Sequence, residues 1–242
     1  MTQFYYPQKI SSDEITLEGE EAYHLIKSYR VKTKEKIRLF DGNGNVYLAE
    51  VVNVCRDKVI VKILTKAYYE RKFHRITLFQ SIIKQDKFEI ILEKITELGV
   101  DRIVPVVADR TEVDTEKFVL KYERFKKIIL EATKQSNRVF ITDLSLPKKF
   151  SEVFLDKSYV FDGTENIIAY KSSFSTGVFE VIKKVNKQKN YNLFIGPTGD
   201  FSPQEIQFFR EQKNVHFVDL GKNILKSETA AIILCGMFVQ LV

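Results

Sequence analysis

Cysteine and histidine, the usual ligands of structural metals, are scarce in this sequence. Its 242 residues include two cysteines, Cys55 and Cys235, and three histidines, and no Cys-x-x-Cys pair occurs. A structural zinc site needs four such ligands at short spacings. We therefore expect no metal site and no disulfide framework.

Long apolar runs are also missing. The longest, residues 230–242, is too short to span a bilayer, and residues 1–7 lack the apolar segment of a signal peptide. We expect a soluble, cytoplasmic protein.

Several motifs for common cofactors and nucleophiles are absent as well. No glycine-rich loop is followed by the Lys-Ser/Thr pair of a P-loop, and no Gly-x-Gly-x-x-Gly follows a first strand. The sequence has no Gly-x-Ser-x-Gly elbow and no carboxylate pair clearly placed for glycosyl transfer. These absences disfavour mononucleotide hydrolysis, dinucleotide redox chemistry, serine hydrolysis and glycosyl transfer.

The sequence does contain enough apolar residues for a hydrophobic core, and it carries an excess of positive charge. With 44% hydrophobic and 29% charged residues, it can form one large domain or two modest ones. The formal net charge of +6 favours a polyanionic partner such as RNA, because lysines and arginines that neutralise phosphates release counterions. A basic surface that serves solubility alone explains this charge equally well.

Up to about residue 68, apolar residues alternate with polar ones, which is typical of half-buried strands. A loop at residues 41–45 (DGNGN) has the composition of a hairpin turn, and one short helix is expected at residues 18–29. We predict a small antiparallel β-barrel domain over residues 1–70. The alternating pairs are Ile37 and Leu39, Val46 and Leu48, Val52 and Val54, and Val59, Val61 and Ile63.

From residue 71 onward, apolar strands alternate with helical segments, which predicts a parallel sheet covered by helices in an α/β domain over residues 71–242. One helix is expected at residues 86–98, with Asp86 as its cap and Gly99 after its end, and another stops near Gln135. The expected strands are residues 76–83, 103–107, 159–161, 193–195 and 215–220.

Two glycine-bearing turns follow successive strands and lead straight into helices. They are residues 195–202 (IGPTGDFS) and 220–230 (LGKNILKSETA). Ser202 and Glu205 form a predicted capping box, and Ser227 is the expected cap of the last helix. Loops at the carboxyl ends of neighbouring strands are where α/β sheets bind ligands, so these turns form the candidate active site. The alternative is that the glycines serve only as connections.

Four segments in order along the chain resemble the 16S ribosomal RNA (uridine-N3) methyltransferase family of the SPOUT class: residues 84–105, 131–138, 195–206 and 220–231. The resemblance implies a SPOUT-type parallel sheet with a C-terminal trefoil knot, and a PUA-like, RNA-binding barrel at the N-terminus. It also implies S-adenosylmethionine as cofactor, 16S rRNA or the small ribosomal subunit as partner, and a homodimer whose interface borders the site.

The resemblance carries site residues over to this chain. RNA contacts are expected from Lys84, Lys87, Arg110 and Arg138. Lys226 or Arg138 is the cation expected to stabilise the uridine anion, and Glu228 is the candidate proton acceptor, although its place in a first helical turn also suits the helix dipole. The implied cofactor-binding residues are Ile195, Gly196, Pro197, Gly199, Leu220, Gly221, Asn223, Ile224, Leu225, Ser227, Thr229 and Ala230.

The chain departs from the family pattern at several positions. Residues 198–200 are Thr-Gly-Asp where the family usually has Glu-Gly-Gly, Asn223 and Lys226 stand in place of arginines, and Gln3 stands where an arginine is expected. Two alternatives follow: a weak or inactive RNA-binding or ribosome-assembly protein that keeps the fold, and a SPOUT methyltransferase acting on another RNA position.

Overall fold

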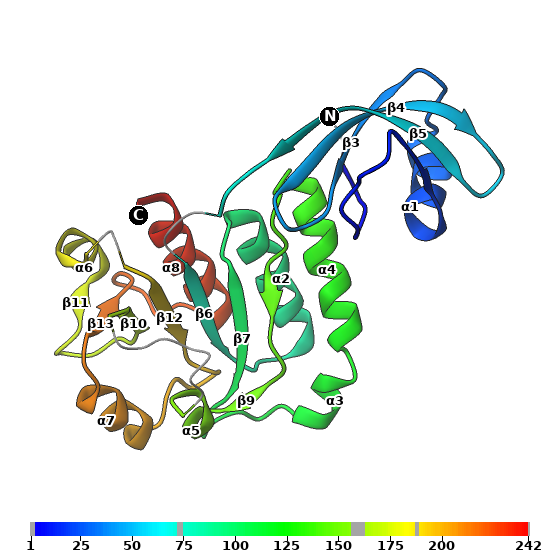
Figure 1. Ribbon diagram of the computed structural model, residues 1–242. Coiled ribbons are helices and arrows are strands. Elements are labelled where there is room, and N and C mark those ends of the chain that lie inside the picture. The colour runs from blue at the N-terminus through cyan, green and yellow to red at the C-terminus, as the bar shows by residue number, and fades with distance from the viewer. Residues whose placement is uncertain (1–2, 72–74, 156–162, 187–188, 242) are drawn as a thin grey trace. The chain divides into compact units, whose positions relative to one another are not determined.

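The computed structural model describes residues 3–71, 75–155, 163–186 and 189–241, drawn in colour in Figure 1. The chain divides into two compact units. The first comprises Met1–Arg71 with Thr133–Ile141, and the second comprises Lys72–Ala132 with Thr142–Val242. The strand expected at residues 159–161 lies outside the described residues.

The first unit is built on a five-stranded sheet in the order β1-β3-β4-β5-β2. Four of its strands pair antiparallel as predicted, but β1 runs parallel to β3, so the prediction of a wholly antiparallel domain is wrong at that edge. The helix expected at residues 18–29 is present as α1 (Gly19–Tyr23) continued by the π-helical turn η1 (His24–Tyr29). The strands are β1 (Gln3–Tyr5), β2 (Glu14–Leu17), β3 (Lys36–Phe40), β4 (Asn45–Val54) and β5 (Val59–Tyr68).

Simple alternation fails along β4. Its register with β5 shifts between Leu48 and Ala49 and again between Val51 and Asn53, as β-bulges do. Each extra residue turns the following side chains to the other face. Val51 is consequently buried, whereas Val52, expected to alternate with its neighbours toward the core, is 44% exposed.

Gln3 is a fully buried structural residue of the first unit. Its Nε2 donates to the backbone carbonyl oxygens of Thr133, at 3.0 Å, and Arg138, at 2.7 Å. Lys134, also buried, forms an ion pair of 2.9 Å with Glu21. These contacts hold the segment 133–141 to β1 and α1 of this unit.

The second unit contains a sheet of eight described strands in the order β11-β13-β10-β12-β6-β7-β8, with β9 also paired to β7. Every pairing is parallel, which confirms the predicted α/β class. The strand β10, between β12 and β13, was not predicted. The strands are β6 (Ile76–Ser81), β7 (Arg102–Val107), β8 (Asp143–Leu144), β9 (Lys148–Lys149), β10 (Glu165–Ala169), β11 (Thr176–Gly177), β12 (Tyr191–Ile195) and β13 (Val215–Asp219).

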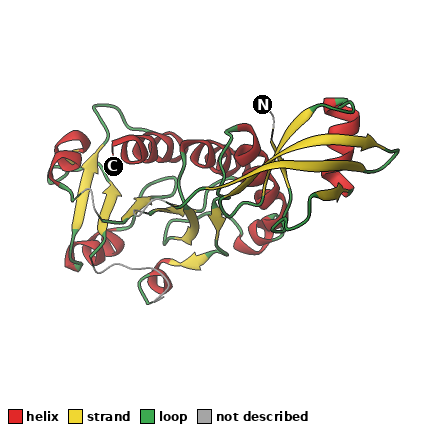
Figure 2. Ribbon diagram, turned by 45° about the horizontal axis from the view of Figure 1, so that its top comes forward, coloured by secondary structure: helices red, strands yellow, loops and turns green. Residues whose placement is uncertain are grey.

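Helices cover both faces of this sheet, as Figures 1 and 2 show. The described helices are α2 (Gln85–Leu98), α3 (Thr115–Val119), α4 (Tyr122–Gln135), α5 (Phe150–Val153), α6 (Val178–Lys184), α7 (Pro203–Glu211) and α8 (Ser227–Leu241). Successive side chains of a strand point to opposite faces. On β12, the ring of Tyr191 meets Phe238 of α8 at 5.3 Å between centroids, and the ring of Phe194 meets Phe209 of α7 at 5.0 Å. The strand is therefore buried from both sides.

The helix ends follow the predicted chemistry in part. Gly99 ends α2 with a φ of 110°, a left-handed conformation that suits glycine. Asp86 is not the cap of α2, because the helix begins one residue earlier and Lys84 occupies the N-cap position. The capping box of α7 is confirmed, with Ser202 Oγ accepting from the Glu205 amide at 3.2 Å. None of the helices described has the length and apolar character to cross a membrane.

Candidate functional site

The second unit contains a cavity of about 770 Å³ where four neighbouring parallel strands, β13, β10, β12 and β6, end. Its walls are the turns that follow these strands, as expected for a ligand site in an α/β sheet. Both glycine-bearing turns take part. The described lining residues are Ile83, Lys84, Lys87, Ala169, Tyr170, Lys171, Ile195, Gly196, Pro197, Thr198, Gly199, Asp200, Val218, Asp219, Leu220, Asn223, Ile224, Leu225, Lys226, Ser227, Glu228 and Ala230.

The first turn folds tightly after β12. A Cβ atom on Gly196 would lie 2.8 Å from Asp200 Oδ1 and 3.1 Å from the Phe201 amide nitrogen, so the turn requires glycine there. Asp200 adopts a φ of 64°, and its Oδ1 accepts from the Phe201 amide at 2.8 Å. Aspartate tolerates this left-handed conformation better than most residues, which accounts for its presence where the family pattern has glycine.

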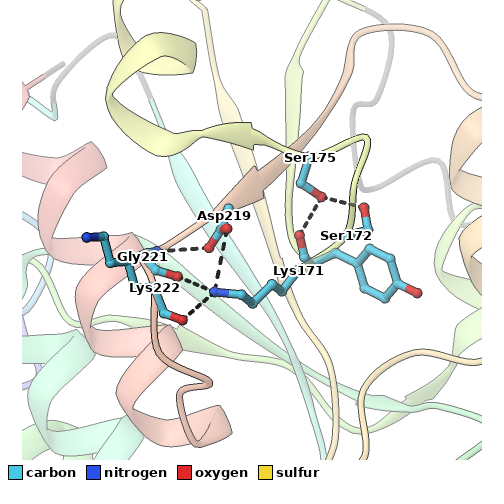
Figure 3. A network of polar contacts seen from close by, with 7 residues as sticks. Lys171, Ser172, Ser175, Asp219, Gly221 and Lys222 are labelled. Atoms are coloured by element: carbon cyan, nitrogen blue, oxygen red, sulfur yellow. Dashed lines mark hydrogen bonds and ion pairs between the residues drawn. The ribbon is translucent and has the colours of Figure 1, made fainter.

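The second turn is held by Lys171, which lies just after β10. Figure 3 shows its ammonium group between the carbonyl oxygens of Gly221, at 2.5 Å, and Lys222, at 2.7 Å, with the carboxylate of Asp219 at 3.7 Å. Asp219 also accepts from the Gly221 amide at 2.9 Å. Gly221 has a φ of 135°, which favours glycine.

A short chain of hydrogen bonds joins the two turns. Gln80 of β6 is fully buried, and its Nε2 donates to Ser227 Oγ at 2.9 Å. Ser227 Oγ donates in turn to the carbonyl oxygen of Gly196 at 2.8 Å. The prediction that Ser227 caps the last helix is wrong, since Ser227 is the first residue of α8 and its hydroxyl connects that helix to the first turn.

The structure brings most of the predicted residues together. Of the twelve candidate cofactor-binding residues, ten line the cavity, and Gly221 and Thr229 are the exceptions among the described residues. Lys226, Glu228, Lys84 and Lys87 also line it.

Of the remaining predicted residues, Arg110 lies beside the first turn, where its Nη1 donates to the Gly199 carbonyl oxygen at 2.5 Å. Arg138 is outside the described lining and belongs to the first unit. Ile224, expected to flank an adenine ring, lines the cavity but is 90% exposed.

Charges of both signs surround the cavity. Lys84, Lys87, Lys171 and Lys226 are cationic, and Asp200, Asp219 and Glu228 are acidic. Burial raises the pKa of Asp200 above its ordinary value, although the hydrogen bond from the Phe201 amide and the charge of Arg110 oppose this rise. The cavity thus combines a half-buried carboxyl group with several exposed ammonium groups.

The wall formed by Ala169, Tyr170 and Lys171 escaped prediction because β10 itself was missed. That strand begins with the buried polar residues Glu165 and Asn166, which interrupt the apolar pattern of a central strand. A usable signal was present in the short run Ile167-Ile168-Ala169 after Gly163.

Comparison with known proteins agrees with this architecture. Residues 70–239 match the family model described as an RNA methyltransferase domain, and residues 17–64 match the model of an RNA methyltransferase PUA domain. The expected PUA-like domain near the N-terminus is thereby confirmed.

Among similar proteins are two ribosomal RNA small subunit methyltransferases E. The protein from Aquifex aeolicus is 30% identical, over 99% of this chain and 100% of that protein. The protein from Mesomycoplasma hyopneumoniae is 31% identical, over 86% of this chain and 87% of that protein.

A crystal structure of the ribosomal RNA small subunit methyltransferase E of Neisseria gonorrhoeae, bound to S-adenosyl methionine, is similar with a TM-score of 0.85 and 28% identity. The match covers 100% of this chain and 98% of that one. The family model matches more than half of the chain. The chain therefore belongs to the RNA methyltransferase family.

Proposed function

We propose that this protein methylates N3 of a uridine in the 16S rRNA of the small ribosomal subunit, with S-adenosylmethionine as the methyl donor. The observation that carries the proposal is the cavity lined by both glycine-bearing turns at the carboxyl ends of four parallel strands. The names of the relatives support the substrate, and the neighbour bound to S-adenosyl methionine supports the donor.

The residues of the cavity fit such a donor. Gly196 lets the first turn close tightly on itself, and the turns offer backbone groups that can bind an adenine. Ile195 and Leu225 offer apolar sides for the ring, and a volume of about 770 Å³ suits a ligand of this size. The proposed cofactor-binding residues are the twelve named from the sequence, ten of which line the cavity.

S-adenosylmethionine supplies a methyl group on a positively charged sulfur. The protein's part is to align donor and acceptor and to exclude water. N3 of uridine must lose its proton, which leaves negative charge on the flanking carbonyl oxygens. We assign Lys226 to stabilise that charge and Glu228, half-buried in the first turn of α8, to accept the proton.

RNA is proposed to contact Lys84, Lys87 and Arg110 in the second unit and Arg138 in the first, where the PUA-like domain also binds it. Arg138 remains the second candidate for the stabilising cation. We further propose a cytoplasmic homodimer, whose interface covers the apolar side chains of α8 that are only partly buried, Ile232, Ile233, Met237 and Val239. The trefoil knot stays a prediction.

Mass spectrometry of nucleosides from 16S rRNA of cells with and without this gene tests the proposal. We expect N3-methyluridine to disappear when the gene is deleted and to return when it is restored. Reverse transcription should stop at the target in the strain that carries the gene and read through it in the deletion strain, because a methyl group on N3 blocks base pairing. Equal amounts of N3-methyluridine in both strains would reject the assignment.

A second candidate is a non-catalytic RNA-binding or ribosome-assembly protein, favoured by Asn223 and Thr198, which line the cavity in place of the family's charged residues. Calorimetry with S-adenosylmethionine separates the two, because absence of binding favours the non-catalytic protein. A methyltransferase acting on another RNA position would instead show a different lost nucleoside in the same mass spectra.

A further inference from the structure

A second, smaller hollow of about 330 Å³ adjoins the cavity in the same unit. The two share Tyr170, Lys171 and Asp200 as a common wall. Arg110, from the loop after β7, and Arg210 of α7 also line the hollow. A ligand in the hollow would therefore lie directly beside one in the cavity.

The hollow is rich in positive charge. Among the described residues that line it, Arg110, Lys171 and Arg210 are cationic and only Asp200 is acidic. Asp200 is directed to the Phe201 amide, and the ammonium group of Lys171 is directed to the carbonyl oxygens of the second turn. Arg110 Nη1 donates to the Gly199 carbonyl oxygen, and its guanidinium group carries further N–H donors. The two guanidinium groups are thus the principal charges that can still donate to an anionic ligand.

Aromatic rings lie next to Arg210. The guanidinium carbon of Arg210 is 4.2 Å from the centre of the Phe174 ring, and Phe174 stacks on Tyr170 at 5.9 Å with an interplanar angle of 28°. Phe174 is 41% exposed. A guanidinium close to an aromatic ring is attracted by that ring and can still donate to a phosphate, and exposed rings stack with unpaired bases.

We propose that this hollow binds a ribonucleotide of the RNA substrate adjacent to the one that enters the cavity. Arg110 and Arg210 bind its phosphodiester group, and the Tyr170–Phe174 pair stacks with its base. The inference rests on the proposed function, because it takes the neighbouring cavity to be the methylation site. Charge and aromatic stacking together match single-stranded RNA, whose unstacked bases proteins recognise in this way.

The full-length variant Arg210→Gln tests this assignment with small ribosomal subunits from a strain that lacks the gene. We expect its dissociation constant for the subunits to rise roughly 5- to 30-fold, and the slope of log affinity against log salt to decrease by about 0.7, the value for one phosphate contact on a single strand. Binding of S-adenosylmethionine, measured by calorimetry, should stay at the wild-type level. The matched control is Lys117→Gln on α3, whose side chain is 82% exposed outside the hollow; it should leave both quantities unchanged.

A second variant separates stacking from charge. Phe174→Ala should weaken subunit binding while keeping the salt slope, because it removes a ring but no cation. Wild-type affinity and slope in Arg210→Gln would overturn the assignment, as would an equal loss in Lys117→Gln. If wild-type protein binds subunits but transfers no methyl group to them, the proposed function fails, whereas the binding data still decide whether the hollow holds RNA.

Discussion

Substitution of Gly196 by alanine tests whether the close packing of the first turn shapes the cavity. The added Cβ atom would lie 2.8 Å from Asp200 Oδ1, 3.1 Å from the Phe201 amide nitrogen and 3.2 Å from the Cα atom of Asp200, whereas ordinary van der Waals contact begins at 3.4 Å. Two of these three atoms are backbone atoms, so the turn itself must move.

Overpacking of this kind costs about 1–3 kcal/mol. If the turn moves aside, the cost appears as weaker binding of S-adenosylmethionine, by roughly 5- to 150-fold, because each 1.4 kcal/mol is a factor of ten. If the turn stays in place, the cost appears as lower stability, with a decrease in Tm of roughly 2–4 °C for each kcal/mol in a chain of this size.

Calorimetric titration with S-adenosylmethionine and thermal unfolding of the same Gly196→Ala preparation measure both effects. Gly177→Ala is the control, since no heavy atom lies within 4 Å of its added Cβ and its φ of −58° suits any residue. A Gly196→Ala protein with wild-type affinity and wild-type Tm would refute the reasoning.

Three further predictions concern the surroundings of the cavity. Lys171→Met should weaken S-adenosylmethionine binding about fivefold in calorimetry, because the carbonyl oxygens of the second turn lose a charged donor worth about 1 kcal/mol. Lys171→Arg should keep part of the affinity that is lost in Lys171→Met. Unchanged affinity in Lys171→Met would contradict this role. Gly236→Ala in α8 should raise the free energy of unfolding by about 0.5–1 kcal/mol, since the new methyl group meets Leu98 at ordinary contact distances of 3.7 and 3.8 Å; a decrease in Tm would show that the helix has no room there. Burial raises the pKa of Glu165, but hydrogen bonds from His216 and Lys189 outweigh that effect and hold the pKa below its ordinary value of 4.5. The stability that this carboxylate contributes should therefore be present above about pH 4.5 and be lost as the pH falls further. In urea unfolding, the difference in unfolding free energy between wild type and Glu165→Gln should shrink below that pH, and a constant difference would contradict the assignment.

The sequence permitted prediction of those features that depend on local chemistry. The capping box of α7 and the glycine after α2 need only short-range geometry, so their residues identify them. The meeting of the two glycine-bearing turns also followed, because the carboxyl ends of parallel strands share one edge of a sheet. The expectation that the two strands are neighbours was wrong, since the unpredicted strand β10 lies between β12 and β13.

Features that depend on long-range contacts could not be predicted. Glu165 is buried at the start of β10 because Lys189 pairs with it and His216 forms a hydrogen bond with it, both from elsewhere in the chain. The role of Ser227 depends on Gly196, 31 positions earlier. The bulges of β4 depend on pairing with β5, and nothing in the alternation of valines indicates where they fall.

The position of Ser227 in the chain has a consequence for when the cavity can form. Ser227 belongs to α8, which follows every other described element that lines the cavity along the chain. Until that helix docks, the carbonyl oxygen of Gly196 lacks its Ser227 donor and one wall of the cavity is absent. A growing chain can accordingly complete its sheet early, yet it becomes competent to hold a nucleoside ligand only as the final helix takes its place.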